Sequence, residues 1–350
     1  MYSRILDVLS TAGFDFLLRN ENRNCWDEAL TGLSYIPVHY SHASIDFLLE
    51  CRQTQDDFCI DISIILKNKD KLYGVWPLSL SSENEVLKIS SHGMPILPPL
   101  FVHSLTDKEC KRLIRECLHL LNSLCAACSI SRWESAESFK DSCHAGLSPW
   151  HLQAMENGAK PGLKHELYID LDLSCENIKR KFRKSYKPLI NSGSRLWDIG
   201  ILNQQGEQSV WEEFHQLYIA AAGRETRSPE AWERQYQAIN NGDAFLVYLK
   251  DKARQMVGAG FFYMTRDEAV YSVAAYNRAL FDKPLGHVVQ YRALEEMKAK
   301  GLRWYKIGPV VYKSDNPTEK ELSIAHFKKG FATHCFPQYC LTQLCHLSNG

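Results

Sequence analysis

The fold of this chain is decided by VGAGFFYMT (257–265), AVYSVAAY (269–276), GHVVQYRALEEMKAKG (286–301) and WYKIG (304–308). The first two runs are rich in β-branched and aromatic residues and lie only three polar residues apart, which predicts a β-hairpin. The third run carries apolar residues at spacing four and a glycine at its end, which predicts a helix. A hairpin, a helix and a strand therefore follow one another. This order places the start of the helix beside a sheet edge, where its unpaired N–H groups can receive an anion or a carbonyl oxygen.

The segments before this core also carry helix and strand signals. Tyr168 to Leu173 alternates as a strand, and Ser174 caps a basic helix that runs to about Asn191, with Pro188 disturbing or ending it. Ser209 and Glu212 predict a capping box for a helix over 210–222. Ser228 followed by Pro229 predicts the start of the next helix.

The N-terminal half has weaker signals. Residues 58–66 and 72–80 predict two strands joined by a turn, and residues 106–128 predict a helix with Thr106 as its N-cap. Turn residues cluster at 157–164, where we place a domain boundary. We therefore expect an N-terminal extension over 1–34, one domain over 35–160 and a second domain over 161–350.

Over Tyr168 to Ala332 the chain resembles the FemAB-like branch of the GNAT acyltransferase superfamily. The resemblance is carried by YIDLDLSCENIKRKFRKSYKPLINSG (168–193), FHQLYIAAAGRETRSPEAW (214–232), the hairpin, helix and strand quoted above, and FKKGFA (327–332). It implies an α/β fold of the mixed α+β kind with two GNAT-like subdomains. Each subdomain would have a mixed, mostly antiparallel sheet flanked by helices. The first would be degenerate, and the second would carry the active site.

The resemblance implies an N-acyltransferase of the kind associated with polysaccharide biosynthesis. It would move the acyl group of acyl-CoA, such as acetyl-CoA, to the amine of an amino sugar or a similar small amine, by direct attack on the thioester. The Q/R-x-x-G-x-G/A phosphate signature of GNAT acetyltransferases is absent, because only DKPLGHV (282–288) precedes the helix. The long coiled-coil insertion of the tRNA-dependent Fem enzymes is absent too. Two alternatives stay open: an aminoacyl-tRNA-dependent transferase, and a degenerate GNAT-fold binding module.

Acyl transfer from a thioester to an amine needs a base for the amine proton, an acid for the leaving thiolate and a donor for the oxyanion. His287, next to the predicted helix start, is a candidate base because its ordinary pKa lies near neutrality and a helix dipole would lower it. His326 is a second candidate. Tyr276 is a candidate acid and Asn277 a candidate substrate-orienting residue, although a strand-end tyrosine also suits packing and an asparagine also suits a turn.

Donor binding is predicted from glycines and lysines. In GNAT-like proteins a splayed strand exposes backbone N–H groups, and Gly258 and Gly260 beside Phe261 suit either a bulge or close packing. Gly286 lies at the helix start. Lys328 and Lys329 could neutralise a phosphate or a carboxylate.

Substrate binding is predicted from two basic segments. Arg224 and Arg227 lie between two predicted helices, and arginine suits bidentate capture of carboxylate or phosphate. Lys181 and Lys184 lie on the basic helix, where they either contact a nucleotide or form a solvated face.

Composition limits the remaining partners. The chain has 41 Lys and Arg against 41 Asp and Glu, so no global charge attracts nucleic acid or an anionic membrane, and tRNA is the less favoured partner. No run of apolar residues is long enough to insert in a bilayer, and the N-terminal residues lack the apolar core of a signal peptide, so we expect a cytoplasmic protein. Cys125 and Cys128 form a lone CxxC that suits helix core, and no metal is expected.

Overall fold

The computed structural model describes residues 2–53, 58–139 and 147–345, and the chain divides into two compact units. Unit 1 comprises residues 1–164 and 338–350, and unit 2 comprises residues 165–337. Residues 338–350 thus return to the first unit, whereas the expected division kept 161–350 together. The first residues are also part of unit 1, because β1 (Asp15–Leu18) pairs with β3 (Ile64–Asn68).

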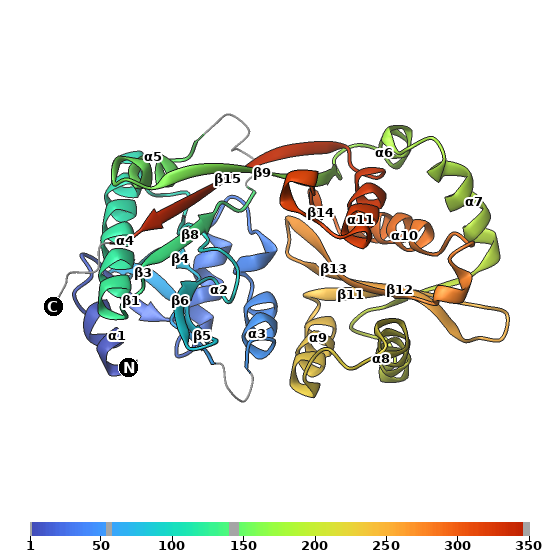
Figure 1. Ribbon diagram of the computed structural model, residues 1–350, viewed down its shortest axis with the longest axis horizontal. Coiled ribbons are helices and arrows are strands. Elements are labelled where there is room, and N and C mark those ends of the chain that lie inside the picture. The colour runs from blue at the N-terminus through green and yellow to red at the C-terminus, as the bar shows by residue number, and fades with distance from the viewer. Residues whose placement is uncertain (1, 54–57, 140–146, 346–350) are drawn as a thin grey trace. The chain divides into compact units, whose positions relative to one another are not determined.

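Unit 1 is built on a four-stranded sheet in the order β1-β3-β4-β7, with helices on both faces (Figure 1). Successive residues of β3 point to opposite faces, as a strand requires. Ile64 and Leu66 pack in a core with α1 and α4, whereas Ile65 packs in a second core with α2. Three further strands form a separate sheet in the order β2-β5-β6. The remaining elements of unit 1 are η1 (Val38–Tyr40), α1 (Tyr2–Leu9), α2 (Arg23–Thr31), α3 (His42–Glu50), α4 (Asp107–Ala127), α5 (Pro149–Glu156), β2 (Cys59–Asp61), β4 (Lys71–Trp76), β5 (Ser79–Glu83), β6 (Val86–Ser90), β7 (Leu100–Phe101) and β8 (Arg132–Ala136).

The predicted helix over 106–128 is confirmed as α4. The Thr106 side chain accepts from the Glu109 backbone N–H, and the Glu109 carboxylate accepts from the Thr106 N–H, so both orphan donors are satisfied. The CxxC cysteines lie at the end of this helix, where Cys125 is fully buried and Cys128 is buried. Burial raises the pKa of the Cys125 thiol, which is the environment of a core residue.

Unit 2 is built on a sheet in the order β10-β11-β12-β13-β14-β9. All neighbours are antiparallel except β13 and β14, which are parallel and joined by α10. Helices α8 and α9 cover one face, and α10 with α7 covers the other (Figure 1). The elements are α6 (Cys175–Lys181), α7 (Tyr186–Leu196), α8 (Gln208–Ala222), α9 (Pro229–Asn241), α10 (Leu285–Ala299), α11 (Glu319–Lys329), η2 (Arg278–Leu280), η3 (Lys313–Asp315), β9 (Lys160–Asp170), β10 (Asp198–Leu202), β11 (Ala244–Lys250), β12 (Met256–Met264), β13 (Glu268–Tyr276), β14 (Trp304–Pro309) and β15 (His334–Leu344).

The predicted hairpin, helix and strand are confirmed as β12, β13, α10 and β14. All nine residues of β12 are buried, because helices cover both faces of the sheet at this strand. This burial explains why VGAGFFYM is continuously apolar rather than alternating.

Two expected helix boundaries are wrong. The basic helix expected over 174–191 is two helices, α6 and α7, and Pro188 lies in the first turn of the second one, where its missing N–H costs no hydrogen bond. Helix α8 begins at Gln208 with Glu207 as N-cap, so Ser209 lies inside the helix and makes no capping box with Glu212.

Candidate active site

A wedge opens in the sheet of unit 2 where β13 and β14 part. These parallel strands pair only over Glu268–Val270 and Trp304–Lys306. Beyond that point β13 stays paired with β12, and β14 stays paired with β9 through a register shift before Gly308. The edge of β13 that faces β14 after Val270 therefore has no strand partner among the described residues. Its backbone N–H groups are available to a bound molecule.

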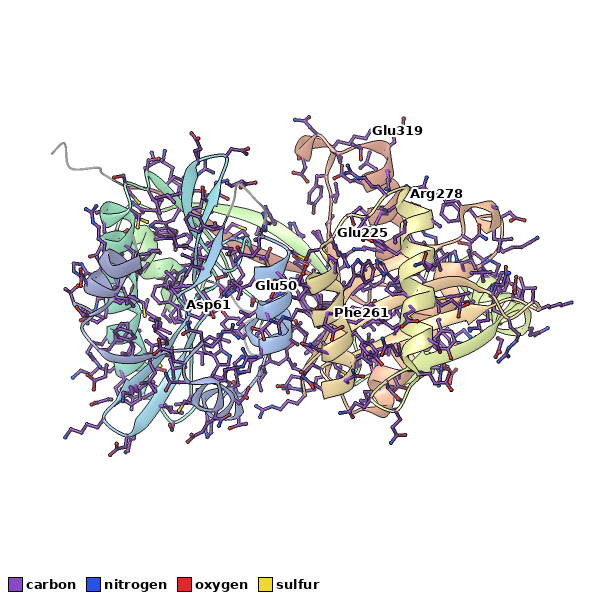
Figure 2. All side chains as sticks on the ribbon, turned by 90° about the horizontal axis from the view of Figure 1, so that it is seen from below. Glu50, Asp61, Glu225, Phe261, Arg278 and Glu319 are labelled. Atoms are coloured by element: carbon purple, nitrogen blue, oxygen red, sulfur yellow. The ribbon has the colours of Figure 1, made fainter. Side chains whose placement is uncertain are left out.

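The glycine-containing strand was expected to hold either a bulge with exposed N–H groups or close packing, and the glycines have the second role. β12 pairs along its length with β11 and β13, so its N–H groups are used within the sheet. A Cβ on Gly258 would lie 2.8 Å from the Tyr276 ring, and one on Gly260 would lie 2.8 Å from Val289. These glycines admit close packing. Phe261 packs on Trp211 of α8 at 5.7 Å, on the face toward the viewer in Figure 2. Donor binding by these three residues stays a prediction.

The ammonium group of Lys328 lies in the wedge. Its Nζ is 5.3 Å from the centre of the Tyr271 ring on β13. On the β14 side, a Cβ added to Gly308 would lie 2.8 Å from the same Nζ. Gly308 has φ +138°, a conformation that other residues avoid, so glycine is required there for two reasons. Burial lowers the pKa of Lys328, and the charge of Glu166 opposes that effect.

A carboxylate and a second lysine lie beside Lys328. Glu166 on β9 faces Pro309 of β14 in the strand register, and its Oε1 is 3.4 Å from Nζ of Lys306. Its Oε2 is buried and has no hydrogen-bond partner among the described residues. Sequence reasoning missed Glu166 and Lys306. The only signal was a glutamate inside the alternating run KHELYID (164–170).

Three buried phenol groups lie at the wedge, those of Tyr271 and Tyr276 on β13 and that of Tyr305 on β14 where the two strands still pair. The hydroxyls of Tyr271 and Tyr276 are 3.4 Å apart, and Tyr305 donates to Gln290 Oε1 on α10. Burial raises the pKa of all three tyrosines, so each keeps its proton at neutral pH. These phenols act as hydrogen-bond donors. Of the three, only Tyr276 was singled out from the sequence.

His287 lies in an aromatic box rather than in the open wedge. Its ring centre is 4.5 Å from that of Tyr186 and 5.1 Å from that of Phe327. The pKa of His287 falls to about 4, first because of burial and second because of the Arg183 charge, and not because of the helix dipole as expected. The imidazole is therefore neutral at pH 7, and its geometry is that of a packing residue. His326 is exposed on α11.

Residues next to the start of α10 have local structural roles. Asn277 Oδ1 accepts from the Ala279 N–H at 3.0 Å, which is the turn role foreseen as its alternative. A Cβ on Gly286 would lie 3.0 Å from the Phe327 ring and 3.4 Å from that of Tyr276. Helix α10 begins after Pro284 without a side-chain cap, so N–H groups of its first turn keep no intrahelical partner.

The break between α6 and α7 supports the helix that carries Lys328. Arg183 Nη2 donates to the His326 carbonyl at 2.9 Å, and the Tyr186 hydroxyl donates to the Phe327 carbonyl at 3.1 Å. The first bond supplies a side-chain donor to the His326 carbonyl in the last turn of α11, and the second adds to the bond that the Phe327 carbonyl accepts from the Gly330 N–H. Arg183 thus positions α11.

The remaining predicted residues do not join the wedge. Arg227 donates to Gln235 Oε1 at 2.8 Å and lies over the rings of Tyr218 and Trp232, on the face covered by α8 and α9. Glu225, labelled in Figure 2, belongs to the same α8–α9 loop. The exposed side chains are Lys181, Lys184, Arg224 and Lys329. Among the predicted residues, Tyr276 and Lys328 therefore line the wedge, Gly258 and Gly286 pack against Tyr276, and His287 lies in the aromatic box beside Phe327.

The architecture matches several solved structures at low sequence identity. A crystal structure of FemX matches with TM-score 0.61 and 12% identity, over 87% of this chain and 96% of that one. L-PGS from Bacillus licheniformis matches with TM-score 0.54 and 11% identity, over 99% and 92%. A tandem GNAT protein from the clavulanic acid biosynthesis pathway matches with TM-score 0.52 and 12% identity, over 96% and 100%.

This chain has the FemAB-like tandem GNAT fold. The resemblance noted in the sequence and the expected pair of GNAT-like subdomains are thereby confirmed. No protein-family model and no curated protein sequence matches the chain. At these identities the likeness establishes the GNAT fold alone, so the chemistry must be argued from the wedge itself.

No group of three or more His, Cys, Asp or Glu side chains is placed to hold a metal ion within residues 2–53, 58–139 and 147–345. Over the same ranges, no helix has the length and apolar character needed to cross a membrane.

Proposed function

We propose that this chain transfers an acyl group from an activated donor to an amine, in the wedge between β13 and β14. The observation that carries the proposal is the position of Lys328, a largely buried cation between the unpaired edge of β13 and Gly308. A carbonyl oxygen in this wedge would meet both an ammonium group and backbone N–H donors. These are the groups that stabilise the oxyanion of acyl transfer.

The reaction follows from these positions. The amine nitrogen attacks the donor carbonyl carbon, and the carbonyl electron pair moves to the oxygen, where Lys328 stabilises the negative charge. The carbon–sulfur bond then breaks and the thiolate leaves. Glu166 accepts the amine proton through its unpartnered Oε2. Tyr271 and Tyr276 donate hydrogen bonds to the leaving sulfur, which takes its proton from water.

For the donor we propose acyl-CoA, with acetyl-CoA as the first example, and for the acceptor an amino sugar or a similar small amine. The uncapped N–H groups at the start of α10 support an anion there, and Gly286 lets the rings of Phe327 and Tyr276 pack close to this turn. The missing phosphate signature counts against a tight pyrophosphate grip. A donor held mainly by its acyl and thioester part is consistent with both observations.

An aminoacyl ester of tRNA is the second candidate donor. It is favoured by the exposed basic residues Arg180, Lys181 and Lys184, which lie at the end of α6 and just beyond it. The similarity to FemX and L-PGS is in keeping with it. The same wedge chemistry applies, with an alcohol as leaving group in place of a thiol.

Binding measurements separate these proposals. The purified chain is titrated with acetyl-CoA, then longer acyl-CoAs, and with deacylated and aminoacylated bulk tRNA at low and moderate salt. Saturable binding of a CoA ester supports the first donor. Salt-sensitive binding of aminoacylated tRNA alone, lost on changing Lys181 and Lys184 to Glu, supports the second. Binding of neither class favours a degenerate binding module.

Lys328→Met tests the role of the buried cation. We expect acyl transfer to fall by roughly 10²- to 10³-fold in kcat, the effect of removing one oxyanion donor. Lys329→Met is the matched control, because Lys329 is the adjacent lysine on the same helix and is exposed. Its activity should stay within about twofold of the parent, since an exposed charge contributes little. Equal losses in the two variants, or none in either, would contradict the proposal.

A further inference from the structure

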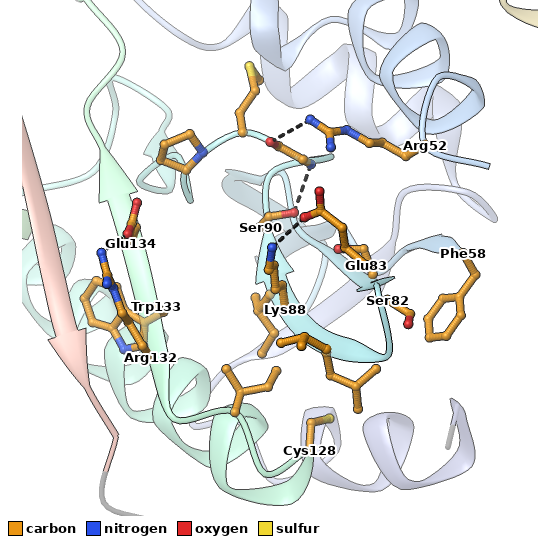
Figure 3. Close-up of a pocket in the computed structure, with 18 of the residues that line it drawn as sticks. Arg52, Phe58, Ser82, Glu83, Lys88, Ser90, Cys128, Arg132, Trp133 and Glu134 are labelled. Carbon is orange, nitrogen blue, oxygen red and sulfur yellow. Dashed lines mark hydrogen bonds and ion pairs between the residues drawn. The ribbon is translucent and has the colours of Figure 1, made fainter. Parts of the chain in front are cut away.

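A turn of unit 1 brings the end of α4 close to the residue that follows β15. The Ile130 N–H donates to the Cys125 carbonyl at 2.8 Å, which closes the turn after α4, and the Cys345 N–H donates to the Ser131 carbonyl, also at 2.8 Å. Figure 3 shows this turn, from Cys128 to the start of β8, where it lines a cavity of about 860 Å³. Two backbone hydrogen bonds therefore hold Cys125 and Cys345 on either side of the same short turn.

The side chain of Cys345 points into the main core of unit 1. Successive residues of a strand point to opposite faces, and β15 keeps its register with β8 as far as Leu344, which lies opposite Arg132. Leu341 belongs to the core that also contains Cys125, and Cys345, four residues further on, packs against the same core. Leu344, on the opposite face, is 63% exposed. The Cys345 thiol therefore faces the core that holds the Cys125 thiol.

The two thiols are direct neighbours. Each thiol is a hydrogen-bond partner of the other, and this bond acts on the pKa of both. Burial is the first cause of the raised pKa of each thiol, so both keep their protons at neutral pH. The Cys125 side chain is fully buried, whereas Cys345 is partly buried. Cys345 is therefore the thiol that an oxidant in solution meets first.

Two other cysteines nearby are placed less well for this contact. Cys128 is the C-cap of α4 and lines the cavity, and it acts on the pKa of Cys125 through its charge alone. Cys340 lies on β15 five residues before Cys345, and therefore on the opposite face of the strand. Its thiol donates to the Gln338 carbonyl at 3.8 Å. Of these three cysteines, Cys345 is the one whose position fits a bond to Cys125.

We infer that Cys125 and Cys345 are a redox-modification site, at which the two thiols join in a disulfide that ties β15 to α4. With oxidised glutathione as the oxidant, the Cys345 sulfur loses its proton and attacks one sulfur of the glutathione disulfide, and one glutathione thiol leaves. The Cys125 sulfur then loses its proton and attacks the Cys345 sulfur of the mixed disulfide, which releases the second glutathione thiol. Two protein thiols are thereby oxidised, and one glutathione disulfide is reduced to two thiols.

The disulfide would stabilise unit 1 because β15 reaches that unit from far along the chain. Leu341 of β15 is 1% exposed in the same core. A bond between positions 125 and 345 closes a long loop, and a long loop loses much of its freedom in the unfolded chain when it is closed. Neither cysteine belongs to the wedge, so the inference stands or falls independently of the proposed acyl transfer.

The test oxidises the purified full chain with oxidised glutathione at about pH 8.5, near the ordinary pKa of a thiol. The reaction is stopped with acid, the remaining thiols are alkylated in denaturant, and the unreduced peptides are mapped by mass spectrometry. Cys345→Ser removes the partner of Cys125. Cys340→Ser is the matched control, because it removes a thiol from the same strand but from the opposite face. We expect a cross-linked pair of peptides containing Cys125 and Cys345 in the parent and in Cys340→Ser, and none in Cys345→Ser.

Amide hydrogen exchange measures the effect of the bond on unit 1. In the oxidised parent, the most protected amides of α4 should exchange about 30-fold more slowly or less, the effect of a typical disulfide, and dithiothreitol should reverse the change. Oxidised Cys345→Ser should show no such slowing. The map of the parent decides the pairing by itself, so the result does not depend on a variant that folds.

Four results would overturn the inference. They are a disulfide between Cys125 and Cys128, glutathione left on Cys345 with no cross-link, no oxidation at either position, and a cross-link that leaves the exchange of α4 unchanged.

Discussion

Arg19 is a buried cation that holds three parts of unit 1 together. It is 2% exposed, and its guanidinium donates to Asp61 and Asp46 at 2.8 Å each and to His42 Nδ1 at 2.7 Å. Burial alone would raise the pKa of Asp61, but the hydrogen bond with His92 and the charge of Arg19 hold it well below its ordinary value. The cluster is thus a satisfied polar network, in which each member depends on the others.

Arg19→Met should destabilise unit 1 by about 3–5 kcal/mol, because it removes a buried cation and all its bonds to Asp46, Asp61 and His42, and leaves Asp61 with His92 and Asp46 with Arg23 alone. Arg23→Met is the control. Arg23 also pairs with Asp46, but its side chain is 45% exposed, so its loss should cost no more than about 1 kcal/mol. Denaturant unfolding followed by circular dichroism measures both. A similar cost for the two variants would show that Arg19 gains little from burial.

His287 predicts a pH dependence of stability. Its pKa is about 4 in the folded chain and 6.5 ordinarily, so the unfolded chain binds the extra proton between these values. The stability linked to His287 is therefore present above pH 6.5 and is lost as the pH falls toward 4. His287→Phe keeps an aromatic ring in the box and removes the titration. We expect its free energy of unfolding to fall less steeply than that of the parent between pH 6.5 and 4; equal slopes would contradict this.

At the scale of elements, α11 is held through two carbonyl bonds, one from Arg183 in the break between α6 and α7 and one from Tyr186 at the start of α7. Arg183→Ala with Tyr186→Phe should therefore displace Lys328 and lower acyl transfer. A double-mutant cycle measures this coupling: added to Lys328→Met, the pair should cause little further loss, because the lysine it positions is gone. If the loss from the pair simply adds to that from Lys328→Met, Arg183 and Tyr186 contribute to acyl transfer by a route other than the position of Lys328. In thermal unfolding, the pair Arg183→Ala and Tyr186→Phe should lower the free energy of unfolding by about 1–3 kcal/mol, because two hydrogen bonds are lost.

The elements of unit 2 show what could and could not be predicted from the sequence. The hairpin, α10 and β14 follow from local pattern, because the strands are short runs rich in β-branched and aromatic residues, and α10 has apolar residues at spacing four and a glycine after its end. The break in the helix after Lys181 could not be predicted from local pattern. Phe182 is 3% exposed and the Arg183 N–H donates to the Gly330 carbonyl, so a contact far along the chain overrides local helix propensity.

The position of the wedge could not be predicted from the sequence for a related reason. Glycines in β12 suggested an opening, but a strand opens only where its neighbours leave it, and pairing partners are not written in local sequence. Lys328 was found from FKKGFA by resemblance. Glu166 and Lys306, by contrast, meet only through the register of β9 and β14. The sequence therefore predicted the site residues that lie on a recognisable motif, such as Lys328, but not those that only strand pairing brings together, such as Glu166 and Lys306.

At the scale of the whole molecule, the return of β15 to unit 1 makes that unit depend on a strand far along the chain from the rest of its core. Cys340 to Leu344 of β15 pair with Ala136 to Arg132 of β8, and the Tyr339 carbonyl lies 3.2 Å from His151 Nε2. Leu341 is 1% exposed and belongs to the main core of unit 1. Unit 1 cannot therefore complete its core until the last strand has been made.

Ending the chain after Pro337 should destabilise unit 1 selectively. The truncation strips β8 of its paired neighbour and removes a buried leucine, whose loss alone costs about 2–5 kcal/mol. Amide hydrogen exchange should become faster along α4 and β8, whereas amides of β12 and β13 should keep their protection, because all of their strand partners lie within 165–337. Leu341→Ala in the full-length chain is a milder variant. It should accelerate amide hydrogen exchange in the same elements as the truncation, but to a smaller extent. Equal acceleration of amide exchange in both units would mean that they unfold as one cooperative body. Unchanged exchange in α4 would mean that β15 only covers a core that is already complete without it.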